Sequence, residues 1–149
     1  MQPRRHLLAW ILRALLAGIF WGWVAAAPAG SAAFGAERLT ARLVEASNTG
    51  DGTDASLRDI QRLLGSNLPF KDFHLVDQST MRLPAEGVVP LRGGFLLRCH
   101  GIADRLAVTF ERDGKVLIQT ELALSSGRPV VLGGFPCPRG KLLLVLTVR

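Results

Sequence analysis

The sequence predicts a mainly β domain with one α-helix, arranged as a mostly antiparallel sheet or sandwich of about seven or eight strands. Three observations support this prediction. Residues 106–124 alternate apolar and polar side chains, residues 142–148 are apolar except for Thr147, and only residues 55–64 show clear helical periodicity. Alternation is the period of a strand, whereas apolar residues three and four apart mark one face of a helix.

Residues 106–124 predict a β-hairpin. Apolar and polar side chains alternate along both halves of this stretch, so each strand has one apolar face. Asp113-Gly114 separates the halves, and this dipeptide tolerates the positive φ angles of a type I′ turn. Because an isolated hairpin is only marginally stable in water, other strands must cover its apolar face.

The other elements follow from the same patterns and from turn residues. An apolar run without alternation predicts a strand covered on both faces, so we expect the last strand to be central, between the helix and a second layer. In the first half of the domain we expect a strand at 38–46, a polar loop at 47–54 and a helix at 55–64, with Asp54 as its cap and Gly65 as its stop. A strand at 73–76 follows, with 80–83 as another strand or its continuation. In the second half we expect an edge strand at 88–91, a strand at 95–102, the hairpin, a short strand at 130–132 that ends at Gly133-Gly134, and the last strand at 141–149.

Residues 1–33 have the composition of a secretory signal peptide. Two arginines give a positive start, an apolar stretch follows, and small residues lead to a cleavage position before Phe34. Cleavage before Gly30 also fits the small-x-small pattern. The alternative is an uncleaved N-terminal membrane anchor, because the apolar stretch approaches the roughly 20 residues that span a bilayer. We therefore expect residues 34–149 to form one exported domain, in the periplasm or outer cell envelope, with membrane contact only through the N-terminal segment.

Composition argues against a nucleic-acid-binding protein. The 149-residue chain has 48% hydrophobic residues and a formal net charge of +6, but three of its 18 lysines and arginines lie in residues 1–33, which contain no acid. The remaining basic residues are scattered among 12 acids. A nucleic-acid surface needs clustered basic residues, preferably with stacking aromatic side chains.

The cysteines offer one candidate covalent feature. Cys99 and Cys137 are the only two in the chain, and an exported protein can bridge such a pair. The alternative is two unpaired thiols, with Cys99 filling the core. Spacing cannot decide between them, because a bridge depends on how close the two Cα atoms lie.

No motif predicts a cofactor, a metal or catalysis. Residues 134–141 resemble a phosphate loop only superficially, because the glycine spacing is wrong and a strand follows the lysine. Cys99, His100, Cys137 and His74 lack the paired spacing of metal ligands. The chain also has no G-x-S-x-G nucleophile elbow.

Several short motifs mark the chain from residue 38 onward: Ala46-Ser47-Asn48, Leu68-Pro69-Phe70, Phe73-His74-Leu75-Val76-Asp77, Val130-Val131-Leu132-Gly133-Gly134 and the Leu-rich final strand. These motifs resemble a set of small exported β-rich proteins of Gram-negative bacteria that have no assigned activity. The likeness implies an order of elements and no catalytic residues. A fainter likeness, of the Gly-Gly strand and the final strand to the C-terminal part of secretins, implies a link to a secretion apparatus, although the long barrel-forming hairpins are absent here.

Three functional hypotheses remain at the level of sequence. The first is a non-enzymatic cell-envelope domain that acts by protein–protein contact. The second is an accessory subunit of a secretion or pilus assembly, in which an exposed strand edge adds to a partner's sheet; its candidate contacts are Val88, Val89, Leu91, Val130, Val131 and Leu132. The third is a periplasmic enzyme or metal protein that uses Cys99, His100 and Cys137.

Overall fold

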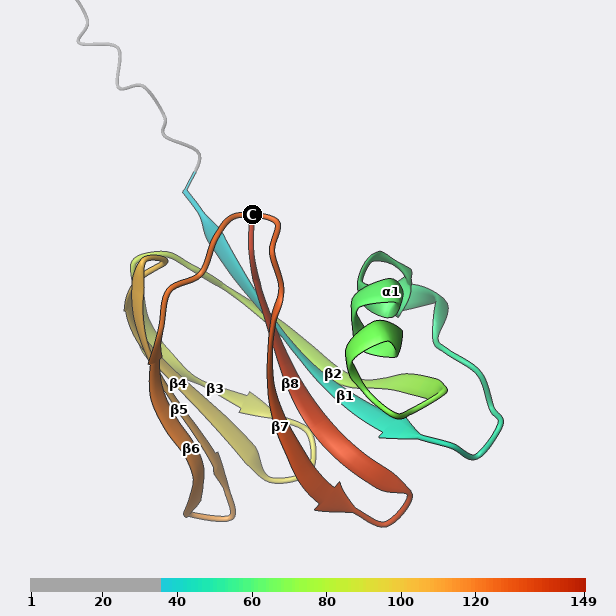
Figure 1. The fold of residues 1–149 in the computed structure, drawn as a ribbon. Coiled ribbons are helices and arrows are strands. Elements are labelled where there is room, and N and C mark those ends of the chain that lie inside the picture. The colour runs from blue at the N-terminus through green and yellow to red at the C-terminus, as the bar shows by residue number, and fades with distance from the viewer. Residues whose placement is uncertain (1–35) are drawn as a thin grey trace, which may run out of the picture. The chain divides into compact units, whose positions relative to one another are not determined.

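The structure is a computed structural model that describes residues 36–149. It confirms the mainly β class, with eight strands, one α-helix and a preceding 3₁₀ turn (Figure 1). The elements are β1 (Arg38–Ser47), a 3₁₀ helix (Ala55–Leu57), α1 (Arg58–Asn67), β2 (Asp72–Arg82), β3 (Ala85–Leu91), β4 (Phe95–Ile102), β5 (Arg105–Arg112), β6 (Lys115–Leu122), β7 (Val130–Cys137) and β8 (Gly140–Val148).

Two four-stranded antiparallel sheets make up the domain. The first sheet has the order β2-β1-β8-β7 and the second has the order β3-β4-β5-β6. The second sheet is a meander of consecutive hairpins, whereas the first combines strands from both ends of the described chain. Figure 1 shows α1 on the outer side of the first sheet, away from the second sheet.

The hairpin of β5 and β6 confirms the predicted turn and corrects the predicted register. Asp113 and Gly114 have φ angles of 50° and 79°, both in the positive region that a type I′ turn requires. The pairing then shifts beside Phe110, so strict alternation along the second strand is wrong. Val116 is exposed as a result, and the strand ends at Leu122.

The last strand is central, as its apolar run predicts. β8 lies between β1 and β7. Leu142, Leu144 and Leu146 face the second sheet, whereas Leu143 and Val145 face α1. Both faces of this strand are therefore removed from water, which explains why it carries almost no polar side chain.

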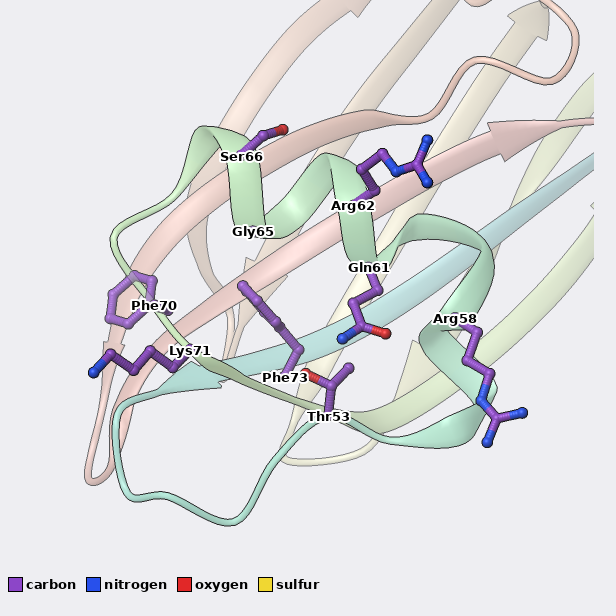
Figure 2. Close-up of a pocket in the computed structure, with 9 residues that line it drawn as sticks. All are labelled: Thr53, Arg58, Gln61, Arg62, Gly65, Ser66, Phe70, Lys71 and Phe73. Carbon is purple, nitrogen blue, oxygen red and sulfur yellow. The ribbon is translucent and has the colours of Figure 1, made fainter.

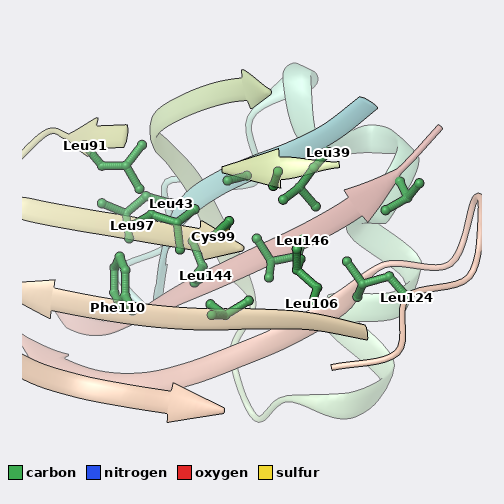
Figure 3. Close-up of a cluster of buried hydrophobic side chains, with 14 of the residues drawn as sticks. Leu39, Leu43, Leu91, Leu97, Cys99, Leu106, Phe110, Leu124, Leu144 and Leu146 are labelled. Carbon is green, nitrogen blue, oxygen red and sulfur yellow. The ribbon is translucent and has the colours of Figure 1, made fainter. Parts of the chain in front are cut away.

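The main core lies between the sheets, and Figure 3 shows its leucines meeting from opposite strands. Phe110 is stacked on Phe95, with ring centroids 5.1 Å apart, and also contacts Phe135 of β7. A second, smaller core lies under the helix, where Ile60 and Leu64 pack on the outer face of the first sheet. Each layer thus buries a separate apolar face, and α1 covers only the first sheet.

The helical segment begins at the predicted residue, Ala55, but the predicted cap and the predicted end of the helix are wrong. The first turn is 3₁₀ and the helix continues to Asn67, so Gly65 lies inside it rather than beyond it. Asp54 makes no capping hydrogen bond. Its carboxylate instead accepts a hydrogen bond from the Leu75 N–H, at 2.7 Å, because the loop before the helix lies along β2.

Residues 80–82 continue the strand at 73–76, which is one of the two expected arrangements, so that β2 is a single strand that ends before Leu83. The strand predicted at 130–132 is longer than expected. β7 does not end at Gly133-Gly134 but continues to Cys137, with a register shift between Gly133 and Phe135. The shift lets the strand bend while both glycines take positive φ angles.

The signal peptide or anchor assigned to residues 1–33 lies outside the described residues. Within residues 36–149, no helix is long and apolar enough to cross a membrane.

Candidate functional site

Both cysteines are free thiols, and they belong to different sheets. Cys99 points from β4 into the core and is only 2% exposed. Burial raises the pKa of its thiol to about 11, so the thiol stays protonated at neutral pH. Cys137 is half-buried at the end of β7. In the structure the two thiols are not bridged, and the thiol of Cys99 is buried and protonated.

The histidines do not join the cysteines. Neighbouring residues on a strand face opposite sides, so His100 is exposed on the outer face while Cys99 is buried. His74 lies elsewhere, with Nδ1 3.2 Å from Asp54 Oδ1 and a buried Nε2 that no described residue contacts by hydrogen bond. Among residues 36–149, no three His, Cys, Asp or Glu side chains are grouped as metal ligands.

The predicted contact residues lie on two edge strands. Val88, Val89 and Leu91 belong to β3, the first strand of the second sheet, and Val130, Val131 and Leu132 belong to β7, the last strand of the first sheet. Both edges carry a proline, Pro90 on β3 and Pro136 on β7, and the pairing of β7 also shifts between Gly133 and Phe135. The edges differ in charge, because β3 carries Glu86, and a charge is a common protection of an edge against strand addition.

β7 is the unprotected edge in terms of charge. Its sequence, VVLGGFPC, has no charged side chain, whereas β2, β3 and β6, the other edge strands of the described sheets, each carry at least one. One edge of β7 pairs with β8 and no described strand pairs with the other. The backbone groups along that free edge can therefore accept another strand.

The side of the sandwich next to β7 is also incompletely closed by side chains. We call this side, bordered by β6 and β7, the β6–β7 seam. On the opposite side, β2 and β3 contact each other, and only three partly exposed apolar side chains of these strands pack against the main core: Val76, Met81 and Val89. Seven apolar side chains at the seam pack against the main core but remain partly exposed: Leu117, Ile118, Leu122, Val130, Leu132, Phe135 and Cys137.

A separate hollow lies beside α1, and we call it the α1 groove. It has a volume of about 740 Å³ and is open to solvent. Figure 2 shows side chains of the helix on one side and those of the segment from Phe70 to Phe73 on the other. Arg58, Arg62 and Lys71 are its charged residues, and no acidic residue lines it.

Sequence reasoning missed this groove, although part of the signal was present. Arg58 and Arg62 are four residues apart, so a helix places them on the same face. That Lys71 approaches the same hollow depends on how the chain returns from α1 to β2. This return is a tertiary feature that residue spacing does not reveal.

The carboxylates of Asp54 and Asp59, close to the α1 groove in sequence, interact with residues that do not line the groove. A hydrogen bond from the Leu75 N–H, together with His74, holds the pKa of the Asp54 carboxyl below its ordinary value. The Arg42 guanidinium does the same for the pKa of Asp59, against the opposing effect of burial. These ionised groups are held by partners outside the groove, so they do not neutralise its cations.

The Asp72 carboxylate organises the loop below the groove. It accepts hydrogen bonds from the backbone N–H groups of Gly50, at 2.7 Å, and Gly52, at 2.9 Å. The bond from Gly50 is the main cause that lowers the pKa of this carboxyl. The loop before the helix is thereby fixed to the start of β2.

The outer face of the second sheet is a third exposed surface. Val88, Ile102 and Val116 are about half exposed there, and Arg98 and His100 lie between them. The apolar side chains are therefore interrupted by polar ones and do not form one continuous patch.

Comparisons with protein-family models, with curated proteins and with solved structures give no match to this chain.

Proposed function

We propose that the chain is an exported, non-enzymatic domain of the cell envelope that binds a protein partner by adding the partner's strand to the free edge of β7. The observation that carries this proposal is the absence of charge from β7 at an edge whose flanking side chains are apolar and only partly buried. Strand addition satisfies the unpaired backbone groups of such an edge and covers its apolar side chains.

The geometry specifies the kind of strand that fits. A strand beside β7 would direct every second side chain toward the β6–β7 seam, where Leu117 and Phe135 are partly exposed. Those positions of the partner should be apolar. Arg128 lies just before β7 and forms no ion pair with a described residue, whereas Arg139, just after β7, is paired with Glu45 at 2.9 Å. An acidic residue at the Arg128 end of the partner strand would therefore complement the charge.

An accessory subunit of a secretion or pilus assembly is the more specific form of this proposal. Subunits of such assemblies need directional, reversible contacts, and backbone pairing along an edge supplies direction and register. The faint likeness of the final strand and the Gly-Gly strand to secretins motivates this form.

Site-specific photo-cross-linking in cells tests the proposal. A photoreactive phenylalanine derivative replaces Val130 on β7 in one variant and Thr80 on β2, a charged edge, in the matched control. We expect a partner adduct from position 130 that is absent from position 80, and mass spectrometry should place the partner's attachment in an extended apolar segment. Equal adducts from both positions, or none from position 130, would overturn strand addition.

Proline substitutions at two neighbouring positions provide the backbone test. In an antiparallel ladder, successive residues point their N–H groups to opposite edges. Of Val131→Pro and Leu132→Pro, one therefore removes an internal hydrogen bond to β8 and the other removes only a free-edge donor. The variant with the higher unfolding temperature is the one that keeps all its hydrogen bonds to β8. This variant should still lose the adduct formed at position 130, and if it retains the adduct, the proposal is contradicted.

A further inference from the structure

We propose that the α1 groove binds a ligand that carries two or more phosphate groups. This site is separate from the edge proposed above, because none of its lining residues belongs to β6 or β7. The argument uses the charge of the groove, the spacing of its arginines and the unusual place of Gly65.

The charge of the residues that line the groove is positive. The acidic residue next to Lys71 is Asp72, whose carboxylate accepts hydrogen bonds from Gly50 and Gly52 and whose pKa Lys71 also helps to lower. Arg58, Arg62 and Lys71 line it, and none of the three forms an ion pair with another residue of the described chain. The neighbouring Asp54 and Asp59 are held by Leu75 and Arg42 instead. Three cations and no carboxylate therefore line the groove.

The spacing of the cations favours more than one anionic group. Arginines four residues apart on a helix have Cβ atoms about 6 Å apart, and Figure 2 shows Lys71 on the other side of the groove from Arg58 and Arg62. One phosphate can engage one guanidinium through two parallel hydrogen bonds. Figure 2 also shows that the charged ends of the three side chains lie apart and point in different directions. A ligand with several linked phosphates could therefore contact more than one of these cations, whereas a single phosphate could not. Thr53, Gln61 and Ser66 add neutral hydrogen-bonding groups along the same hollow.

Gly65 keeps this space open. It lies inside α1, where glycine lowers helix stability by about 1 kcal/mol relative to alanine. A Cβ atom built on it would meet nothing within 4 Å, so no packing requirement explains the glycine. Its place in the wall of the groove does explain it, since any side chain at this position would occupy the space above Phe70 and Phe73.

The same chemistry could come from a free oligophosphate or from the headgroup of a phosphorylated lipid. Inorganic tripolyphosphate is the probe for the first source, and vesicles of phosphatidylcholine with cardiolipin, which has two phosphates, are the probe for the second. Vesicles of phosphatidylcholine alone correct for any binding through residues 1–33. If the chain floats with cardiolipin vesicles and a variant without the groove cations does not, the ligand is a lipid headgroup. If the chain binds tripolyphosphate but does not float with cardiolipin vesicles, the ligand is a soluble oligophosphate.

Isothermal titration calorimetry of the full chain with tripolyphosphate tests the site itself. The groove variant carries Arg58→Gln, Arg62→Gln and Lys71→Gln, and the control variant carries Arg92→Gln, Lys115→Gln and Arg128→Gln, which remove the same charge from positions outside the groove. We expect the groove variant to lose about tenfold or more in affinity, because charge-assisted hydrogen bonds to phosphate are lost. The control should change by about twofold or less, which is the screened effect of net charge alone.

Gly65→Leu is the steric test. It should weaken tripolyphosphate binding without lowering the unfolding temperature, because leucine favours the helix and its Cβ atom meets nothing within 4 Å. Two results would overturn the proposal: an equal loss in the groove and control variants, or undiminished binding in both the groove variant and Gly65→Leu. The absence of tripolyphosphate binding and of cardiolipin-dependent flotation in the unaltered chain would also overturn it.

Discussion

Arg42 and Asp59 join the sheet to the helix through one bifurcated contact. The Arg42 Nη1 atom, on β1, donates to both carboxylate oxygens of Asp59 on α1, at 2.8 and 3.0 Å. The Arg149 Nη2 atom donates to the same carboxylate, at 3.0 Å. The helix is thus tied both to a central strand and to the residue that follows the last strand, beside the apolar contacts of Ile60 and Leu64.

Replacing Asp59 with Asn should weaken this attachment. Asp59→Asn removes the charge that two arginines share, and since the carboxylate is partly exposed, we expect the free energy of unfolding to fall by about 1 kcal/mol. Asp104→Asn is the matched control, because Asp104 is exposed and has no ion pair or side-chain hydrogen bond with a described residue. Denaturant unfolding measures both, and equal changes would show that the contact does not stabilise the helix.

Acid should destabilise the domain through the same carboxylates. The pKa values of Asp54 and Asp59 are lowered from the ordinary 3.8. A lowered carboxyl pKa contributes stability that is fully present above the unfolded value and disappears as pH falls through the folded value. The midpoint of unfolding should therefore not change with pH near neutrality, and it should decrease once the pH is below about 4. The decrease should be smaller for Asp59→Asn. An identical acid profile for Asp59→Asn would contradict this linkage.

The two thiols should differ sharply in reactivity. Cys99 is buried with its pKa raised to about 11, whereas Cys137 is half-buried at a strand end. A thiolate-specific reagent near pH 8 should label only Cys137 in the native chain and both cysteines in denaturant. Cys137→Ser should abolish native labelling, and Cys99→Ser should leave it unchanged. A native chain that reacts only after reduction would instead show a disulfide.

Gly140 should not tolerate even a methyl group. A Cβ atom on this first residue of β8 would collide with the carbonyl oxygen of Ala46 on the paired strand. Because backbone atoms cannot rotate away, Gly140→Ala should destabilise the domain by about 1–3 kcal/mol. Gly87→Ala is the control, since a Cβ atom at that exposed position of β3 meets nothing within 4 Å. Equal unfolding midpoints for the two variants would contradict the close approach.

Some features were determined by the sequence alone because they depend on neighbouring residues. The turn at Asp113-Gly114 follows from local φ preferences, and both residues take positive φ angles. The central place of β8 follows from its apolar run, because only a strand covered on both faces can avoid polar residues. The mainly β class and the single α-helix follow from the same periodicities.

Other features were decided by the tertiary structure because they depend on segments far apart in the chain. Asp54 was expected to cap the helix, but its carboxylate accepts a hydrogen bond from the Leu75 N–H on β2 instead. Sequence could not show that Cys99 and Cys137 would lie on different sheets, or that Lys71 would face the arginines of α1. Side-chain periodicity is a local property, whereas strand order and the pairing of charges are fixed only when the whole chain minimises its exposed apolar surface and unpaired polar groups.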